Sequence, residues 1–166
     1  MQLGILSDTH DKVERTRAAV DLLVASGAEA LIHCGDITIP EVVYPLAALP
    51  SYFVFGNCDF DLDPLRDAIA AIGGTCLGRG GLIELAGRRL AVTHGDSDRE
   101  ITRLAAERPE YFFSGHTHQA LDVRRGPTRF INPGALHRAS SWTVALLDCS
   151  ADQLRMLTLN STGMGA

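Results

Sequence analysis

Short apolar runs alternate with helix-like segments in the first half of the chain, and this alternation limits the possible folds most. Three runs have the composition of buried strands: residues 3–6, 30–33 and 52–55. Apolar residues recur at rough helical spacing in residues 13–24, and further helices are predicted at residues 40–49 and 65–72. A fourth helix is predicted in the second half, at residues 99–106. Strands that alternate with helices predict a parallel sheet with helical crossover connections.

The second half of the chain predicts antiparallel strands. Residues 82–93 contain two short strands around Ala86 and Gly87, a pattern typical of a hairpin. Further strands are predicted in five segments: residues 111–114, 121–124, 128–131, 142–147 and 153–159. The last two are joined through Ala151 and Asp152, so we expect them to pair. The sequence shows no internal repeat and no linker, which predicts one mixed α/β domain over residues 1–166.

Composition and charge exclude several classes of protein. With 46% hydrophobic and 21% charged residues, the chain resembles an average soluble globular protein. A net charge of -5 argues against a protein that binds extended nucleic acid through a basic surface. Neither a signal peptide nor an apolar run of membrane-spanning length is present, so we expect a cytoplasmic protein without membrane contact. A homo-oligomer is compatible with these features.

The four cysteines do not predict a disulfide framework, because no CxxC pair occurs and their density is low. We expect Cys34, Cys76 and Cys149 to be free and buried, as free cysteines commonly are. Cys58 differs because it lies within one of the polar clusters described next.

Five polar clusters each follow a predicted strand. They are Asp8-Thr9-His10, Gly35-Asp36, Gly56-Asn57-Cys58-Asp59, Thr93-His94-Gly95 and Gly115-His116-Thr117-His118. The carboxyl ends of strands in open α/β sheets line the ligand crevice, so these residues can converge on one site. In the first and last clusters the i and i+2 side chains share one side of an extended chain, which suits one metal or two adjacent metals.

The donor types in these clusters predict a transition-metal site. Two carboxylates, four imidazoles and one amide suit Mn, Fe or Zn better than Ca²⁺ or Mg²⁺ alone. Each motif by itself also has a common structural explanation, such as a turn or a hydrogen-bonded histidine. The combination of all five favours metal binding. His33 and His137 are interpreted as structural or rim residues.

Together with Asn132-Pro133-Gly134-Ala135, the ordered motifs resemble the calcineurin-like metallophosphoesterase superfamily, and in particular its small bacterial and archaeal phosphodiesterases. The resemblance spans about residues 3–148. It implies an α/β fold with four layers, in which two mixed β-sheets pack face to face and α-helices flank them.

The resemblance also implies a ligand set for two divalent transition-metal ions, Mn²⁺ by preference, with Ni²⁺, Zn²⁺ or Fe as alternatives. One ion takes Asp8, His10, Asp36 and His118. The other takes Asp36, Asn57, His94 and His116. Asp36 is then the bridging ligand, consistent with a carboxylate having two oxygens.

These ligands imply an enzyme that hydrolyses a small phosphate ester by in-line attack of a metal-bridging hydroxide. Two cations contribute a formal charge of about +4, two aspartates about -2 and hydroxide about -1, so the net charge that faces the substrate would be about +1. A singly charged phosphodiester balances this charge better than a monoester.

The sequence departs from larger superfamily members, which carry a proton-donating His where Cys58 stands. A thiol is a poor proton donor at its ordinary pKa of about 8.5. Asp59 is assigned here as a catalytic residue together with Asn57, with loop orientation or helix capping as the alternative role for Asp59. Ala135 replaces a Ser of many relatives. Arg138 is either a phosphate contact or a solvated surface residue.

Two alternative functions remain on sequence grounds. A retromer subunit of this fold acts chiefly as a protein-interaction scaffold, but such scaffolds have altered ligand residues, whereas all seven ligand positions are filled here. A phosphomonoesterase or nucleotidase of the same superfamily normally has added loops or domains, which this short chain lacks.

Overall fold

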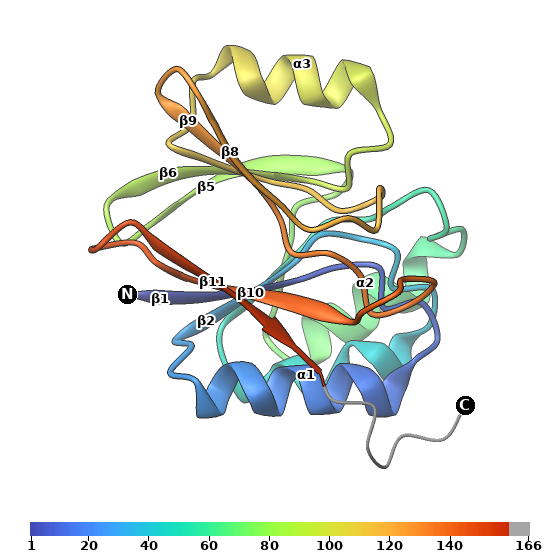
Figure 1. Cartoon of the computed structure of the whole chain (residues 1–166). Helices are drawn as coiled ribbons and strands as arrows, with labels where there is room; N and C mark the ends of the chain where they lie inside the picture. The colour runs from blue at the N-terminus through green and yellow to red at the C-terminus, as the bar shows by residue number, and fades with distance from the viewer. Residues whose placement is uncertain (160–166) are drawn as a thin grey trace.

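A computed structural model describes residues 1–159 and shows two β-sheets between layers of helices (Figure 1). In the first sheet the strands have the order β11-β10-β1-β2-β3-β4. Their bounds are Gln153–Thr158, Thr143–Asp148, Gln2–Leu6, Ala30–His33, Ser51–Phe53 and Thr75–Cys76. Strands β1 to β4 are parallel, and β10 and β11 add an antiparallel edge. The predicted pairing of the two C-terminal strands is confirmed.

The second sheet has the order β5-β6-β7-β9-β8. Its strands are Gly80–Leu85, Arg88–Thr93, Tyr111–Phe113, Thr128–Asn132 and Leu121–Arg125. Strands β6, β7 and β9 are parallel, whereas β5 and β8 are antiparallel to their neighbours. The β5–β6 hairpin turns at Ala86 and Gly87, whose φ values of 53° and 67° are the left-handed conformation that such turns require. The predicted hairpin is confirmed.

Three separate clusters of buried apolar side chains fill the spaces between four layers. Alternate residues of one strand face opposite clusters: Ala30 and Ile32 point between the two sheets, whereas Leu31 packs toward the helices α1 (Val13–Ala25) and α2 (Leu62–Ala71). Phe112 of β7 joins Leu104 of α3 (Asp98–Ala106) on the outer face of the second sheet. This arrangement confirms the predicted four-layer α/β fold.

The helical layer beside the first sheet corrects one sequence prediction. Residues 40–49 were expected to form one helix, but they form two short 3₁₀ helices, Pro40–Val42 and Tyr44–Ala48. Pro45 explains the difference, because a proline within an α-helix removes a backbone donor and clashes with the preceding turn.

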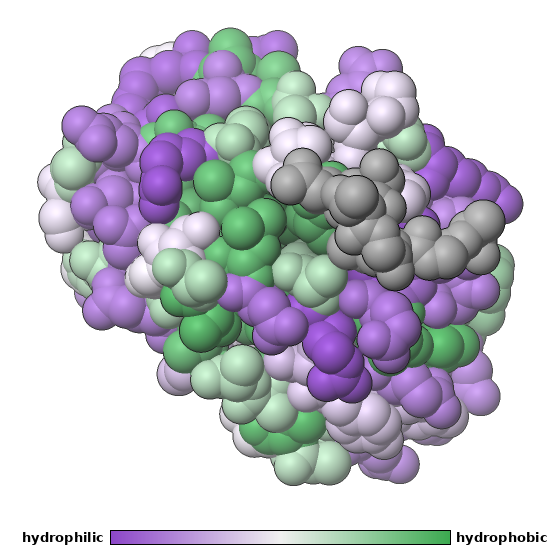
Figure 2. Space-filling view, turned by 60° about the horizontal axis from the view of Figure 1, so that its bottom comes forward, coloured by the Kyte–Doolittle hydropathy of each residue, from purple (hydrophilic) through white to green (hydrophobic). Residues whose placement is uncertain are grey.

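Seen from the side of α1, hydrophilic side chains surround a central apolar area (Figure 2).

Two smaller differences concern the end of one strand and an edge strand. Strand β3 ends at Phe53, although Val54 and Phe55 remain buried beyond it. The two-residue strand β4 was not predicted, and Cys76 within it is exposed, which corrects the expectation that it is buried. Among residues 1–159, no helix is long and apolar enough to cross a membrane.

Candidate metal centre

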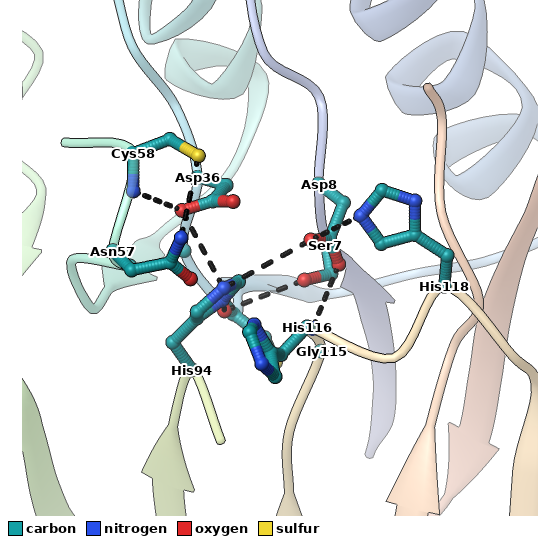
Figure 3. A network of polar contacts seen from close by, with 12 residues as sticks. Ser7, Asp8, Asp36, Asn57, Cys58, His94, Gly115, His116 and His118 are labelled. Atoms are coloured by element: carbon teal, nitrogen blue, oxygen red, sulfur yellow. Dashed lines mark hydrogen bonds and ion pairs between the residues drawn. The ribbon is translucent and has the colours of Figure 1, made fainter. Parts of the chain in front are cut away.

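The carboxyl ends of five parallel strands bring the predicted site residues together. Asp8 and His10 follow β1, Asp36 follows β2 and Asn57 follows β3. The second sheet supplies three imidazoles: His94 follows β6, and His116 and His118 follow β7. Figure 3 shows six of these side chains converging from both sheets: Asp8, Asp36, Asn57, His94, His116 and His118. The strand-end clusters therefore do meet in one place, as the sequence predicted for residues at the carboxyl ends of strands.

Short distances connect carboxylates and imidazoles within this cluster. His118 Nε2 lies 3.1 Å from Asp8 Oδ1, and His94 Nε2 lies 3.4 Å from Asp36 Oδ1. His10 Nε2 is 3.8 Å from Asp36 Oδ2. In three groups, the potential ligand atoms all lie within 4.8 Å of one another: Asp8–His10–His118, Asp8–Asp36–His94 and His10–Asp36–Cys58. Such groups are compact enough to hold a cation.

Hydrogen bonds to main-chain carbonyls orient two of the imidazoles. His94 Nδ1 lies 2.8 Å from the carbonyl oxygen of Cys34, and His118 Nδ1 lies 3.3 Å from that of Arg138. A proton on Nδ1 donates to the carbonyl and leaves the lone pair of Nε2 directed into the cluster. This is the usual arrangement of a metal-binding histidine and its outer partner.

Three buried polar atoms in the cluster make no hydrogen bond to any other part of residues 1–159. They are Asp8 Oδ1, His10 Nε2 and His94 Nε2. A buried carboxylate or imidazole atom without a partner is costly, so such atoms call for an explanation. A divalent transition metal supplies one, because carboxylate oxygens and imidazole nitrogens are its preferred ligands. The residues present therefore fit a metal site.

Backbone strain is concentrated in the same residues. Asp8, His10, Asp36, His116 and His118 all have positive φ values, between 48° and 67°. This left-handed conformation is uncommon for residues other than glycine and costs of order 1 kcal/mol or more at each position. Strain that gathers at convergent polar groups is typical of functional sites.

Charges within the cluster shift the ionisation of its members. Burial alone raises the pKa of Asp36, but the neighbouring imidazole of His94 and the N–H donated by Cys58 outweigh burial and hold the pKa well below its usual range. Burial lowers the pKa of His94, whereas the nearby carboxylates of Asp36 and Asp8 raise it more. An imidazole nitrogen must be deprotonated to bind a metal, so a raised pKa makes metal binding at this position depend on pH.

Asp59 lies behind the cluster and is fully buried. Its Oδ2 accepts the N–H groups of Asp36 at 3.1 Å and Gly56 at 2.7 Å. Its Oδ1 accepts those of Ile37 at 2.8 Å and Thr38 at 2.7 Å. Burial raises the pKa of this carboxyl group, whereas the N–H donors lower it. This geometry favours the loop-orienting role over that of a proton donor in contact with substrate.

Asn57, Cys58 and His116 lie on the solvent side of the cluster. The side chain of Asn57 is exposed, and its Nδ2 donates to Cys58 Sγ at 3.5 Å. Burial and the neighbouring carboxylate of Asp36 raise the pKa of the Cys58 thiol to about 11. His116 is exposed, its N–H donates to Asp8 Oδ2 at 3.1 Å, and its ring lies 5.1 Å from that of His94.

The two remaining histidines occupy different positions. His33 is fully buried and contacts the Thr9 hydroxyl at 2.9 Å, and its Nδ1 accepts the N–H of Gly35 at 3.1 Å. Burial lowers the pKa of His33 to about 3, so it is neutral and structural. The ring of His137 lies 4.7 Å from that of His10, at the rim.

Asn132 belongs to a motif noted in the sequence, but its role in orienting the site was not predicted. The buried amide of Asn132 donates to the carbonyl of Gly115 at 2.7 Å and to Thr117 Oγ1 at 3.1 Å, and accepts the N–H of Gly134 at 2.9 Å. It thus fixes the loop that carries His116. A buried polar residue directly after a strand was the available signal.

A four-layer α/β fold with carboxylates and imidazoles gathered at its strand ends defines a candidate metal-dependent hydrolase. Residues 1–152 match the calcineurin-like phosphoesterase superfamily domain, and the chain belongs to this superfamily. Members of the superfamily use divalent metal ions, and the cluster contains candidate ligands for them.

Three known proteins illustrate the relationship. The chain is 25% identical over 166 residues to phosphodiesterase MJ0936 of Methanocaldococcus jannaschii, covering 96% of this chain and 99% of that protein. A solved archaeal phosphodiesterase shares the fold with a TM-score of 0.86 and 24% identity, covering 96% of this chain and 100% of that one. Vps29 of Entamoeba histolytica, complexed with Zn²⁺, shares the fold with a TM-score of 0.66 and 16% identity, covering 98% and 95% of the two chains.

Proposed function

We propose that this protein hydrolyses phosphodiesters and that two divalent transition-metal ions, Mn²⁺ by preference, are its cofactors. The observation that carries the proposal is the convergence of Asp8 Oδ1, His10 Nε2 and His94 Nε2, all buried and all without a hydrogen-bond partner within residues 1–159. The name of the relative MJ0936, a phosphodiesterase, supports the choice of reaction.

Seven side chains are the proposed ligands. One set consists of Asp8, His10, Asp36 and His118, and the other of Asp36, Asn57, His94 and His116. The compact group Asp8–Asp36–His94 contains members of both sets, which supports neighbouring ions that share Asp36. Bound divalent cations polarise a phosphoryl oxygen and lower the pKa of water near phosphorus.

The chain itself positions these groups and limits proton transfer. Asn57 has an exposed amide that can both contact a cation through its oxygen and donate to an anionic substrate oxygen. The Cys58 thiol has a raised pKa, so it stays protonated near neutral pH. Because Asp59 is fully buried, we assign it a positioning role, and leaving-group protonation has no strong donor among these three residues.

A phosphodiester is the proposed substrate class because of charge. Two divalent cations next to Asp8 and Asp36 retain a modest positive charge, which a singly charged diester balances best. Small substrates are expected, since the acidic chain offers no general surface for extended nucleic acid.

The test is to strip the purified protein of metal, reload it with Mn²⁺, Zn²⁺, Ni²⁺ or Mg²⁺, and assay phosphodiesters, phosphomonoesters and cyclic nucleotides. We expect turnover of diesters that exceeds that of monoesters and is highest with Mn²⁺. The matched control is Asp36→Asn, which keeps the size of the side chain and should be inactive. If no metal supports hydrolysis of any ester while the ions bind, the protein is a scaffold of this fold instead.

A further inference from the structure

A groove of about 220 Å³ lies on the outer face of the second sheet, between α3 and β8. We call it the α3–β8 groove. Its floor is formed by Phe112 and Phe130, whose stacked rings are 5.1 Å apart. Ile101 of α3 lines one side, and Leu121 and Val123 of β8 line the other. Arg125 also lines the groove, with its guanidinium carbon 5.8 Å from the centre of the Phe130 ring, so the surface is mainly apolar but includes this cation.

The groove exists because α3 covers only part of this face. The helix has nine residues and packs on β5 and β6, so the outer face of the other three strands is less covered (Figure 1). Leu121 is left 47% exposed. Apolar side chains that are gathered in a concave surface commonly mark a ligand site, whereas single exposed ones do not.

One end of the groove is built from the loops of the candidate metal centre. Gly95, which follows His94, lines it, as do Gly115 and Thr117 on either side of His116. A Cβ atom added to Gly95 would lie 3.8 Å from the Cβ of His116, so the wall of the groove and the imidazole-bearing loop are in contact. The hydrogen bond from Asn132 to Thr117 fixes this wall.

We infer that the α3–β8 groove binds one apolar ester group, aromatic by preference, of a phosphodiester whose phosphate lies at the metal centre. The inference rests on the proposed function. The volume of the α3–β8 groove is below the roughly 300 to 1,000 Å³ of pockets for drug-sized ligands, so the groove suits one substituent and not a whole molecule. The partly exposed ring of Phe130, stacked on the buried ring of Phe112, offers an aromatic group the offset or edge-on contacts that such rings prefer.

Two substrates with the same leaving group test the inference. Methyl p-nitrophenyl phosphate and phenyl p-nitrophenyl phosphate both release p-nitrophenolate, but only the second has a further aromatic group, the one retained on phosphorus, to place in the groove. We expect the wild-type protein, loaded with Mn²⁺, to have a lower KM for the phenyl diester. Leu121→Asp adds a charge to the groove at a half-exposed position, so the fold should survive.

The measured quantity is the ratio of the two KM values. Leu121→Asp should raise KM for the phenyl diester relative to the methyl diester by about five- to tenfold. The matched control is Val24→Asp on α1, which is 41% exposed and outside the groove, and it should leave the ratio unchanged. Thermal unfolding of both variants confirms that each is folded.

Different outcomes separate this inference from the proposed function. An unchanged ratio in Leu121→Asp, with normal turnover of both diesters, would overturn the groove as a subsite and leave the phosphodiesterase intact. An equal change in Leu121→Asp and Val24→Asp would do the same. A wild-type protein that binds Mn²⁺ and hydrolyses neither diester would overturn the proposed function and this inference with it.

Discussion

Asp59 accepts the backbone N–H of Asp36 at 3.1 Å, so a fully buried carboxylate fixes the main chain of the proposed bridging ligand. The same carboxylate binds the N–H groups of Ile37, Thr38 and Gly56. Two cluster loops, one after β2 and one after β3, are thereby held together. We expect Asp59 to act on metal affinity through the geometry of these loops.

The variant Asp59→Asn tests this role. An amide has one acceptor oxygen, so its NH₂ group would face two of the four N–H donors, and leaving these buried donors unpaired costs about 1 to 3 kcal/mol of the free energy of unfolding. Metal affinity should fall about 10- to 100-fold, as it does when outer partners of metal ligands are lost. Urea unfolding and metal titration measure the two effects.

The exposed Asp61, two residues further on, provides a control of equal charge change. Asp61→Asn should affect neither quantity. If Asp59→Asn kept normal stability and metal affinity but lost turnover even at saturating metal, Asp59 would act in proton transfer and the positioning role would be wrong.

Metal binding should stabilise the folded state, because the cluster atoms that would bind the metal come together only when the chain is folded. At a free metal concentration of about 100 times the dissociation constant, the free energy of unfolding should rise by about 2.7 kcal/mol. For a chain of this size that corresponds to a rise in Tm of about 5 to 10 °C. Differential scanning calorimetry with Mn²⁺ and then with a chelator measures it. Asp36→Asn should lose the shift, and equal shifts in both proteins would place the bound ion elsewhere.

A second polar cluster joins the two sheets far from the metal centre. Asp152, in the β10–β11 turn, accepts the hydroxyl of Tyr111 at 2.9 Å and the guanidinium of Arg129 at 2.7 Å, and pairs with Arg124. Asp152→Asn should reduce stability at pH 7 by about 1 to 2 kcal/mol, a modest value because Asp152 is 43% exposed. Asp21→Asn, at an exposed position on α1, is the control.

The loss in Asp152→Asn should also depend on pH. Burial raises the pKa of Asp152, but the hydrogen bonds from Arg129 and Tyr111 outweigh it and lower the pKa below its ordinary value of about 4. A carboxyl group with a lowered folded pKa stabilises the protein above its unfolded pKa, and this contribution disappears as the pH falls. Wild type and variant should therefore converge in stability below about pH 4. A constant difference down to pH 3 would contradict this account.

The sequence predicted most of the fold because its patterns are local. The apolar runs and the hairpin at Ala86 and Gly87 mark elements whose periodicity is visible within a few residues. The segment 40–49 was interpreted wrongly because its apolar content suggested a helix, although Pro45 prevents one. Strand β4 was missed because two exposed residues carry no periodic signal and pair only where β3 already lies beside them.

The site was predicted in part for a similar reason. Residues such as Asp8 and His94 follow strands, and the geometry of a parallel sheet brings strand ends together. The interactions of Asp59 and Asn132 could not be predicted from the sequence, because each binds a main-chain group of a different loop. Asp59 binds the N–H of Asp36, 23 residues away, and Asn132 binds the carbonyl of Gly115, 17 residues away. Such contacts depend on how the loops pack against each other, which no local sequence pattern predicts.

The final prediction concerns Cys58, which occupies the position where larger relatives have a proton-donating His. Its thiol has a pKa raised to about 11, so it transfers a proton poorly to a departing alkoxide at neutral pH. Hydrolysis should therefore depend steeply on the leaving group, with activated aryl diesters cleaved much faster than alkyl ones. Cys58→His should help poor leaving groups most, by up to about 10² to 10⁴ fold.

A series of diesters with graded leaving-group pKa, assayed with wild type, Cys58→His and Cys58→Ala, measures this dependence. Cys58→Ala serves as the matched control, because it removes the thiol without adding a proton donor and should keep the steep slope. The main-chain N–H of Cys58 donates to Asp36 at 2.8 Å, and the alanine variant retains this contact. A shallow slope in the wild type that becomes steep in Cys58→Ala would show that the thiol already donates the proton, and the predicted absence of a strong acid would be wrong.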